Sequence, residues 1–148
     1  MDEAINVSRI KSGTLNLKNK RILIVDDVEF NRDILSTLLE GTGVVIDKAK
    51  DGTAAVKLFS GNKYDLVFMD LHMPVTNGYI ATLNIRALPL PWANSTPIIS
   101  VSAEYSLELQ AKCREVGMND HLAKPVITDT LFSIIAKWLP ETGISYGK

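Results

Sequence analysis

The fold is decided by one stretch of the sequence, Tyr64-Asp65-Leu66-Val67-Phe68-Met69-Asp70-Leu71-His72-Met73-Pro74. Its apolar part, residues 66–69, is short and unbroken, and turn-forming residues close it off downstream at Pro74, Asn77 and Gly78. This pattern is typical of a strand that is buried on both faces, as in a parallel sheet. Asp70 then lies at the carboxyl end of the strand, where open α/β sheets place their ligands. A single Asp at such a place can also simply cap the next helix.

Outward from this stretch, five predicted strands alternate with five predicted helices. The strands span residues 21–25, 44–49, 66–70, 97–102 and 119–123. The helices span residues 29–40, 51–60, 76–87, 106–116 and 128–138. This alternation predicts a doubly wound α/β sheet in a single domain over residues 20–139. Residues 1–19 are interpreted as a tail or linker, and residues 140–148 as a C-terminal tail.

The composition is that of an ordinary globular domain, with 148 residues of which 46% are hydrophobic and 22% charged. Sixteen basic and seventeen acidic residues give a net charge of −1, which argues against a dedicated nucleic-acid surface. The single cysteine, Cys113, excludes an intrachain disulfide framework and a cysteine-based zinc site. No apolar run approaches the roughly 18 residues of a membrane span, and the N-terminus does not resemble a signal peptide. We therefore expect a cytoplasmic protein without direct nucleic-acid or membrane contacts.

Polar residues follow the predicted strands at one edge of the sheet, because right-handed crossovers bring all the strand-to-helix turns to that edge. Asp26 and Asp27 follow the first strand, and Asp70 ends the third. Ser102 ends the fourth strand, and Lys124 follows the fifth. Each residue alone has an ordinary explanation as a helix cap, a turn hydroxyl or a surface charge. Their joint placement indicates a site with three carboxylates, a hydroxyl and an ammonium group.

The three carboxylates indicate a divalent cation. At an effective dielectric constant near 20, two carboxylates about 4 Å apart repel by on the order of 4 kcal/mol. Lys124 offsets part of this repulsion, and a cation accounts for all three acids. The available ligands are oxygens from Asp27 and Asp70, a backbone carbonyl just after Asp70, and water, a set that selects Mg²⁺ over zinc and leaves Mn²⁺ open. The side chain of His72 should point away from the cluster while its carbonyl points inward.

Such a site is suited to phosphate chemistry. The cation, the Lys124 ammonium and the Ser102 hydroxyl can each bind one oxygen of a phosphoryl group on Asp70. Asp70 is then predicted to be the nucleophile and the site of an acyl phosphate.

Four segments within about residues 20–139 occur in a specific order: Ile-Leu-Ile-Val-Asp-Asp, Leu-Val-Phe-Met-Asp-Leu-His-Met-Pro-Val-Thr-Asn-Gly, Ile-Ile-Ser-Val-Ser-Ala and His-Leu-Ala-Lys-Pro. Together they resemble the receiver domain of two-component response regulators. Asn31 and the run Met-Asp-Leu-His-Met-Pro-Val look like the receivers of hybrid histidine kinases. The resemblance implies a flavodoxin-like sheet with strand order 2-1-3-4-5.

The resemblance also assigns roles to the residues of the site. It implies an acidic pair at Asp26 and Asp27, the phosphoacceptor Asp70, the switch hydroxyl Ser102, the lysine Lys124, a metal-binding carbonyl at His72 and a cis peptide bond before Pro125. Three residues before the lysine, many receivers carry a Tyr or Phe that acts as a rotameric switch, whereas this chain carries His121. His121 either turns inward together with Ser102 or stays a solvent-facing contact that switches nothing.

The expected function is that of a phosphoacceptor domain in a two-component phosphorelay, not an enzyme, although it can assist its own phosphorylation and dephosphorylation. The phosphoryl group would come from a histidine kinase or a histidine phosphotransfer protein. The response would pass to a downstream protein target or to linked kinase domains, through the start of the first helix at Val28 and Phe30 or through the face formed by the fourth and fifth helices.

Two other readings stay open. One is a degenerate receiver that acts only as a protein-interaction module. The other is an aspartyl-nucleophile phosphohydrolase, although Asp70-Leu71-His72 lacks the second acid of an Asp-x-Asp motif. A nucleotide-binding enzyme is not expected, because the phosphate-binding sequence Gly-x-x-x-x-Gly-Lys-[Ser/Thr] does not occur.

Overall fold

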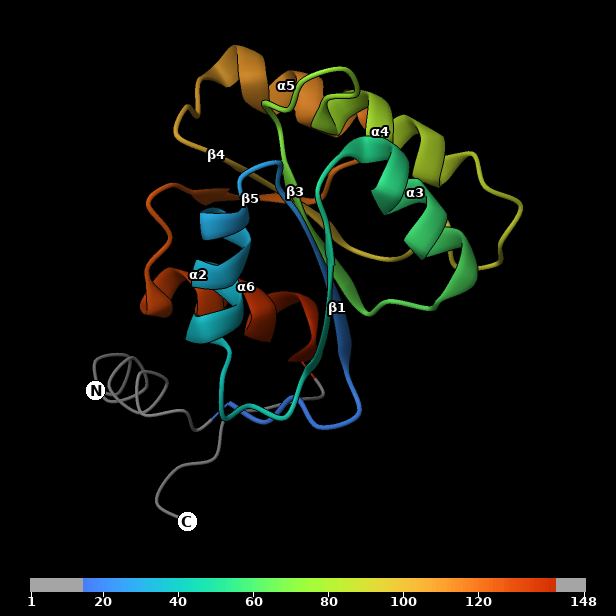
Figure 1. The fold of residues 1–148 in the computed structure, drawn as a ribbon. Helices are drawn as coiled ribbons and strands as arrows, with labels where there is room; N and C mark the ends of the chain where they lie inside the picture. The colour runs from blue at the N-terminus through green and yellow to red at the C-terminus, as the bar shows by residue number, and fades with distance from the viewer. Residues whose placement is uncertain (1–14, 141–148) are drawn as a thin grey trace.

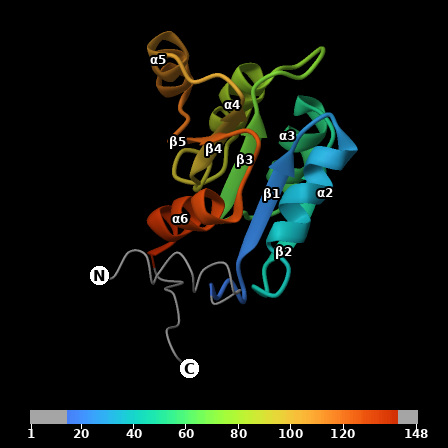
Figure 2. The same cartoon turned by 90° about the vertical axis from the view of Figure 1, so that its left-hand side faces the viewer.

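Five parallel strands form one sheet in the computed structural model, which describes residues 15–140 (Figure 1). The strands are β1 (Arg21–Val25), β2 (Val45–Ala49), β3 (Leu66–Asp70), β4 (Ile98–Ser102) and β5 (Asp120–Ala123). Their order in the sheet is β2-β1-β3-β4-β5, which confirms the doubly wound sheet and the strand order that the sequence led us to expect. Figure 2 shows β1 and β3 running in the same direction at the centre of the sheet.

Five helices pack on the two faces of this sheet. They are α2 (Glu29–Leu38), α3 (Gly52–Gly61), α4 (Gly78–Arg86), α5 (Leu107–Val116) and α6 (Thr128–Trp138). Helices α2 and α6 cover one face, and α3, α4 and α5 cover the other (Figure 1). Each crossover between strands that are consecutive in the chain therefore carries a helix, as a doubly wound fold requires.

Two helices are shorter than predicted by two or more residues, for local reasons, whereas α5 is shorter by one. Helix α2 ends at Leu38 rather than residue 40, and the chain then turns through Gly41 and Gly43, which both have left-handed φ values near +87°. Helix α4 begins at Gly78 rather than residue 76, because the Asn77 side chain caps it by accepting a hydrogen bond from the Ile80 amide at 3.0 Å.

Gly78 also brings the start of α4 against the end of β3. A Cβ atom at this position would lie 2.3 Å from the backbone carbonyl oxygen of Asp70, so no other residue fits without displacing the backbone. The close approach places the loop after Asp70 tightly over the carboxyl end of the strand.

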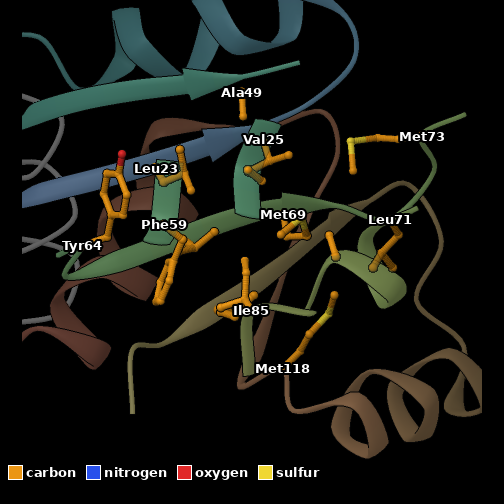
Figure 3. Close-up of a cluster of buried hydrophobic side chains, with 14 of the residues drawn as sticks. Leu23, Val25, Ala49, Phe59, Tyr64, Met69, Leu71, Met73, Ile85 and Met118 are labelled. Carbon is orange, nitrogen blue, oxygen red and sulfur yellow. The ribbon is translucent and has the colours of Figure 1, made fainter. Parts of the chain in front are cut away.

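The sheet separates two apolar clusters, one under α2 and α6 and the other under α3, α4 and α5. Strand β3 contributes to both, with Leu66 and Phe68 on one side and Val67 and Met69 on the other. Figure 3 shows the second cluster, in which Phe59 and Met69 pack beneath the helices. All five residues of β3 are buried, which confirms the prediction of a strand covered on both faces.

The packed part of the chain begins earlier than the predicted boundary at residue 20. Leu15 and Leu17 are buried in the cluster under α2 and α6, and the Leu17 amide donates to the Thr42 carbonyl at 2.8 Å. The segment 15–19 is therefore not a free tail, because its two leucines complete the core. Residues 1–14 and 141–148 lie outside the described part of the chain, so the tails predicted there stay predictions. Between residues 15 and 140, no helix has the length and apolar character needed to cross a bilayer.

Candidate functional site

Three carboxylates meet at the carboxyl edge of the sheet. The parallel pairing of Val25 with Met69 brings the turn after β1 beside the end of β3, and with it Asp26 and Asp27 beside Asp70. One oxygen from each carboxylate lies within 4.8 Å of the other two. Asp26 and Asp70 are each only 3% exposed, whereas Asp27 faces solvent. The edge predicted from strand order therefore does gather the three acids.

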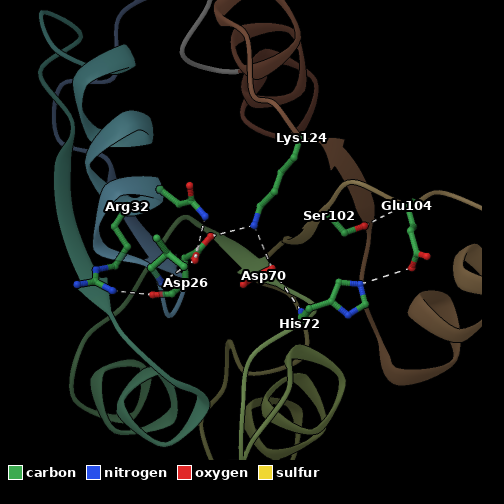
Figure 4. A network of polar contacts seen from close by, with 9 residues as sticks. Asp26, Arg32, Asp70, His72, Ser102, Glu104 and Lys124 are labelled. Carbon is green, nitrogen blue, oxygen red and sulfur yellow. Dashed lines mark hydrogen bonds and ion pairs between the residues drawn. The ribbon is translucent and has the colours of Figure 1, made fainter.

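Lys124 joins this cluster from the end of β5. Its Nζ atom lies 3.2 Å from Asp26 Oδ2 and 3.4 Å from Asp70 Oδ1 (Figure 4). Its backbone amide donates to the Ser102 carbonyl at 3.0 Å, and the peptide bond to Pro125 is cis, as the resemblance implied. Burial lowers the pKa of Lys124, but the charges of Asp70 and Asp26 outweigh burial and raise this pKa above its ordinary value. Lys124 is therefore a firmly charged cation.

Asp70 is destabilised as an anion. Burial, and after it the charge of Asp26, raises the pKa of Asp70 above its ordinary value, although Lys124 and the His72 amide act in the opposite direction. One ammonium group thus faces three carboxylates, two of them buried. An all-oxygen donor set with excess negative charge fits a hard divalent cation such as Mg²⁺.

The side chain of His72 points away from the acids. Its Nε2 atom lies 3.7 Å from Glu104 Oε1, and both side chains are largely exposed (Figure 4). Its backbone amide stays at the site and donates to Asp70 Oδ1 at 3.3 Å. This orientation agrees with the expectation that only the backbone of His72 takes part, and metal binding by its carbonyl stays a prediction.

Ser102 is buried at the end of β4, but its hydroxyl bonds within its own loop. The Oγ atom donates to the Glu104 carbonyl at 2.6 Å. The hydroxyl must leave this carbonyl before it can bind anything on Asp70.

His121 is half-buried, and its ring points toward Ser100. Its Nδ1 atom is 2.8 Å from Ser100 Oγ, and its ring stacks on Tyr105 with a centroid separation of 4.1 Å and an interplanar angle of 3°. Burial lowers the pKa of His121, and Asp120 only partly opposes this. Sequence reasoning missed Ser100 and Tyr105. The available signal was that Ser100 and Ser102 share one face of a buried strand, where a hydroxyl needs a partner.

The start of α2 holds Asp26 in place. Asp26 Oδ1 accepts from the Val28 amide at 2.9 Å and from Asn31 Nδ2 at 3.4 Å. Arg32 Nη1 donates to the Asp26 backbone carbonyl at 2.7 Å (Figure 4). Asn31 was expected to belong to this region, whereas Arg32 was missed because its contact is to a backbone atom.

The comparison with known families agrees with this geometry. The model of the response regulator receiver domain matches residues 22–136. Hybrid signal transduction histidine kinase B of Dictyostelium discoideum is 36% identical in an alignment of 132 residues that covers 82% of this chain. The chain spans only 7% of the length of that kinase.

Two solved structures share the fold. One is the receiver domain of sensor histidine kinase PA1611 from Pseudomonas aeruginosa PAO1, with a magnesium ion coordinated in its active-site cleft. It is 33% identical with a TM-score of 0.74, covering 82% of this chain and 98% of that one. The other is the co-crystal structure of the Saccharomyces cerevisiae histidine phosphotransfer protein Ypd1 with the receiver domain of Ssk1, at 27% identity and a TM-score of 0.75 over 88% of this chain and 96% of that one. With a family match over residues 22–136, the chain belongs to the response regulator receiver domains.

Proposed function

We propose that Asp70 is the phosphoacceptor of this receiver domain and takes its phosphoryl group from a partner histidine. The observation that carries the proposal is the cluster of Asp26, Asp27 and Asp70, whose oxygens lie within 4.8 Å of one another beside the ammonium group of Lys124. In the transfer, the bond from phosphorus to the histidine nitrogen breaks and a bond to an Asp70 carboxylate oxygen forms.

The residues of the cluster would hold Mg²⁺ through the carboxylates of Asp26, Asp27 and Asp70 and the backbone carbonyl of His72, and the same oxygen set would also accept Mn²⁺. When bound, the cation supplies positive charge to the phosphoryl oxygens. Support for Mg²⁺ comes from the excess negative charge of the site and from the magnesium ion in the PA1611 receiver.

Lys124 and Ser102 complete the proposed site. The Lys124 ammonium, already 3.4 Å from Asp70 Oδ1, would bind one phosphoryl oxygen. The Ser102 hydroxyl would bind another after leaving the Glu104 carbonyl. This movement makes Ser102 the proposed switch, and the Lys124 and Ser102 groups would let the domain assist its own phosphorylation and dephosphorylation.

The donor is a histidine kinase or a histidine phosphotransfer protein, and we place its docking site beside the start of α2. A mainly apolar groove of about 420 Å³ lies there beside the ion pair of Asp26 and Lys124, with Phe30 and Ile34 in its lining. Val28 and Phe30 are 45% and 69% exposed, which is costly for apolar side chains that have no partner. The Ssk1 receiver shares this fold and is found with a histidine phosphotransfer protein. We place the reaction in the cytoplasm, with a downstream protein or linked kinase domains as the receiver of the signal.

Intact mass after exposure to acetyl phosphate tests the proposal. With Mg²⁺ the wild type should gain one phosphoryl group, and Asp70→Asn should gain none. The matched control is Asp33→Asn, which removes an exposed carboxylate that pairs with Lys48, and this variant should label like the wild type. Equal labelling of Asp70→Asn would place the nucleophile elsewhere. A wild type that takes up no phosphate would favour the degenerate interaction module.

A further inference from the structure

The loop between β4 and α5 connects the Ser102 hydroxyl to an exposed aromatic ring. Residues 103–105 belong to no helix or strand and run from the end of β4 toward α5. At one end, Ser102 Oγ donates to the Glu104 carbonyl at 2.6 Å (Figure 4). At the other end, the ring of Tyr105 stacks face to face on His121 at 4.1 Å. The carbonyl that accepts the Ser102 hydroxyl therefore belongs to the peptide unit that leads directly into Tyr105.

The His121 side of this stack is fixed to packed elements. Ser100 is fully buried in the middle of β4, and its hydroxyl donates to the Asp120 carbonyl at 3.2 Å while lying 2.8 Å from His121 Nδ1. The His121 amide donates to Asp120 Oδ1 at 2.8 Å, and the second oxygen of that carboxylate accepts from Trp138 of α6 at 2.8 Å. Rotating the imidazole outward would break its bond to a fully buried hydroxyl, which is costly.

The Tyr105 side of the stack is free to move. The Tyr105 side chain is 52% exposed and lies on a loop, so its departure uncovers little buried surface. The loop also depends on the Ser102 hydroxyl for its hydrogen bond to Glu104. Once the hydroxyl turns to a phosphoryl oxygen, the Glu104 carbonyl loses that donor and the loop backbone changes its position.

We infer that Tyr105 is the side chain that moves when Asp70 is phosphorylated, while His121 keeps its hydrogen bond to Ser100. The stack opens, and one face of the His121 imidazole becomes available between α5 and α6. The inference rests on the proposed function, because it requires Ser102 to bind a phosphoryl oxygen.

NMR of the histidine rings with beryllofluoride and Mg²⁺, a mimic of the phosphoryl group, tests the inference. The ring-proton shifts of His121 report the stack with Tyr105, and the Nδ1 nitrogen shift reports the bond to Ser100. His121→Asn assigns the signals against those of His72, and Tyr105→Ala provides the reference for an open stack. The amide of Leu71 reports independently whether the mimic has bound.

On binding of the mimic, the His121 ring-proton shifts should move to the values of Tyr105→Ala while the Nδ1 shift stays constant. Tyr105→Phe, which keeps the ring, should respond like the wild type. In Ser102→Ala the Glu104 carbonyl has no hydroxyl donor even before the mimic is added, so the His121 ring-proton shifts should already match those of Tyr105→Ala and should not change when the mimic binds. Binding with unchanged ring-proton shifts, or with a changed Nδ1 shift, would overturn the inference and leave the phosphoacceptor assignment standing. A Leu71 amide that does not respond would overturn the proposed function and the inference with it.

Discussion

Replacing Asp70 by Asn should stabilise the metal-free protein. The change keeps the size of a nearly fully buried side chain and removes a charge that lies beside two other carboxylates. A buried like-charge cluster weakens the folded state because the charges separate on unfolding. The three carboxylates of the proposed site would therefore lower the stability of the metal-free protein, and the bound cation would offset this loss.

The size of the effect follows from the distances. With an effective dielectric constant of about 20, each neighbouring carboxylate at 4.8 Å repels Asp70 by about 3.5 kcal/mol. The attraction to Lys124 at 3.4 Å stabilises the Asp70 carboxylate by about 5 kcal/mol at the same dielectric constant. These charges leave at most about 2 kcal/mol, and water screens the exposed Asp27, which lowers this figure. Asn also lacks the cost of burying a charge, which is the largest cause of the raised pKa of Asp70, so the net gain for Asp70→Asn is on the order of 1–2 kcal/mol. For a chain of this size such a gain raises Tm by about 3–8 °C.

Thermal and urea unfolding of both proteins in EDTA, at pH 7.5 and near pH 4, measures this difference. The pKa of Asp70 is raised in the folded state, so the folded protein keeps this proton to higher pH than the unfolded chain. The loss of folding free energy caused by the Asp70 charge is absent below the pKa of Asp70 in the unfolded chain. It grows as the pH rises through the pKa of Asp70 in the folded protein. The advantage of Asp70→Asn should therefore be large at pH 7.5 and small near pH 4.

Mg²⁺ should reverse the ranking, because it stabilises only a folded site that can bind it. At one hundred times the dissociation constant, the wild type gains about 2.7 kcal/mol, which exceeds the advantage of Asp70→Asn. Asp33→Asn, the control with an exposed carboxylate, should change stability by no more than about 0.5 kcal/mol. An Asp70→Asn variant that is less stable than the wild type in EDTA, or whose advantage is equal at both pH values, would refute the electrostatic reasoning.

Three further predictions concern residues around the site. Arg86→Lys should lower the free energy of unfolding in urea by about 2–4 kcal/mol yet leave phosphorylation intact. The Arg86 guanidinium donates twice to the Gly117 carbonyl, at 2.7 and 3.1 Å, as well as to other loop oxygens. A loss of labelling in the folded variant would contradict a purely structural role. The stability advantage of the wild type over His121→Asn should shrink as the pH falls below about 6.5. The pKa of His121 is lowered in the folded protein, so the unfolded chain takes up this proton first as the pH falls. A Tm difference between the two proteins that is the same at pH 5.5 and pH 8 would count against this prediction. Lys124→Ala in Mg²⁺ should stay folded and accept phosphate at Asp70 but show no accompanying shift of the α5 amides by NMR, whereas outright unfolding would make Lys124 a structural residue.

Much of the architecture is encoded locally. The run from Leu66 to Met69 is short and wholly apolar, which favours a strand that is covered on both faces, and the structure buries all of β3. Once five such strands alternate with helices, the handedness of the crossovers brings every strand end to one edge. For this reason the meeting of Asp26, Asp70 and Lys124 could be predicted from residue order alone, before any distance was known.

Other features are decided only when the elements pack against one another. Leu15 and Leu17 sit in a polar segment with no periodic pattern, yet they fill the space between α2 and α6. The position of the His121 ring depends on Ser100, which is 21 residues away in the sequence, and on stacking with Tyr105. Short-range patterns report which face of an element is apolar, since they arise from the repeat of a single helix or strand. They do not report which side chain of one element meets which of another, because that depends on how closely and at what register the elements approach in the folded protein.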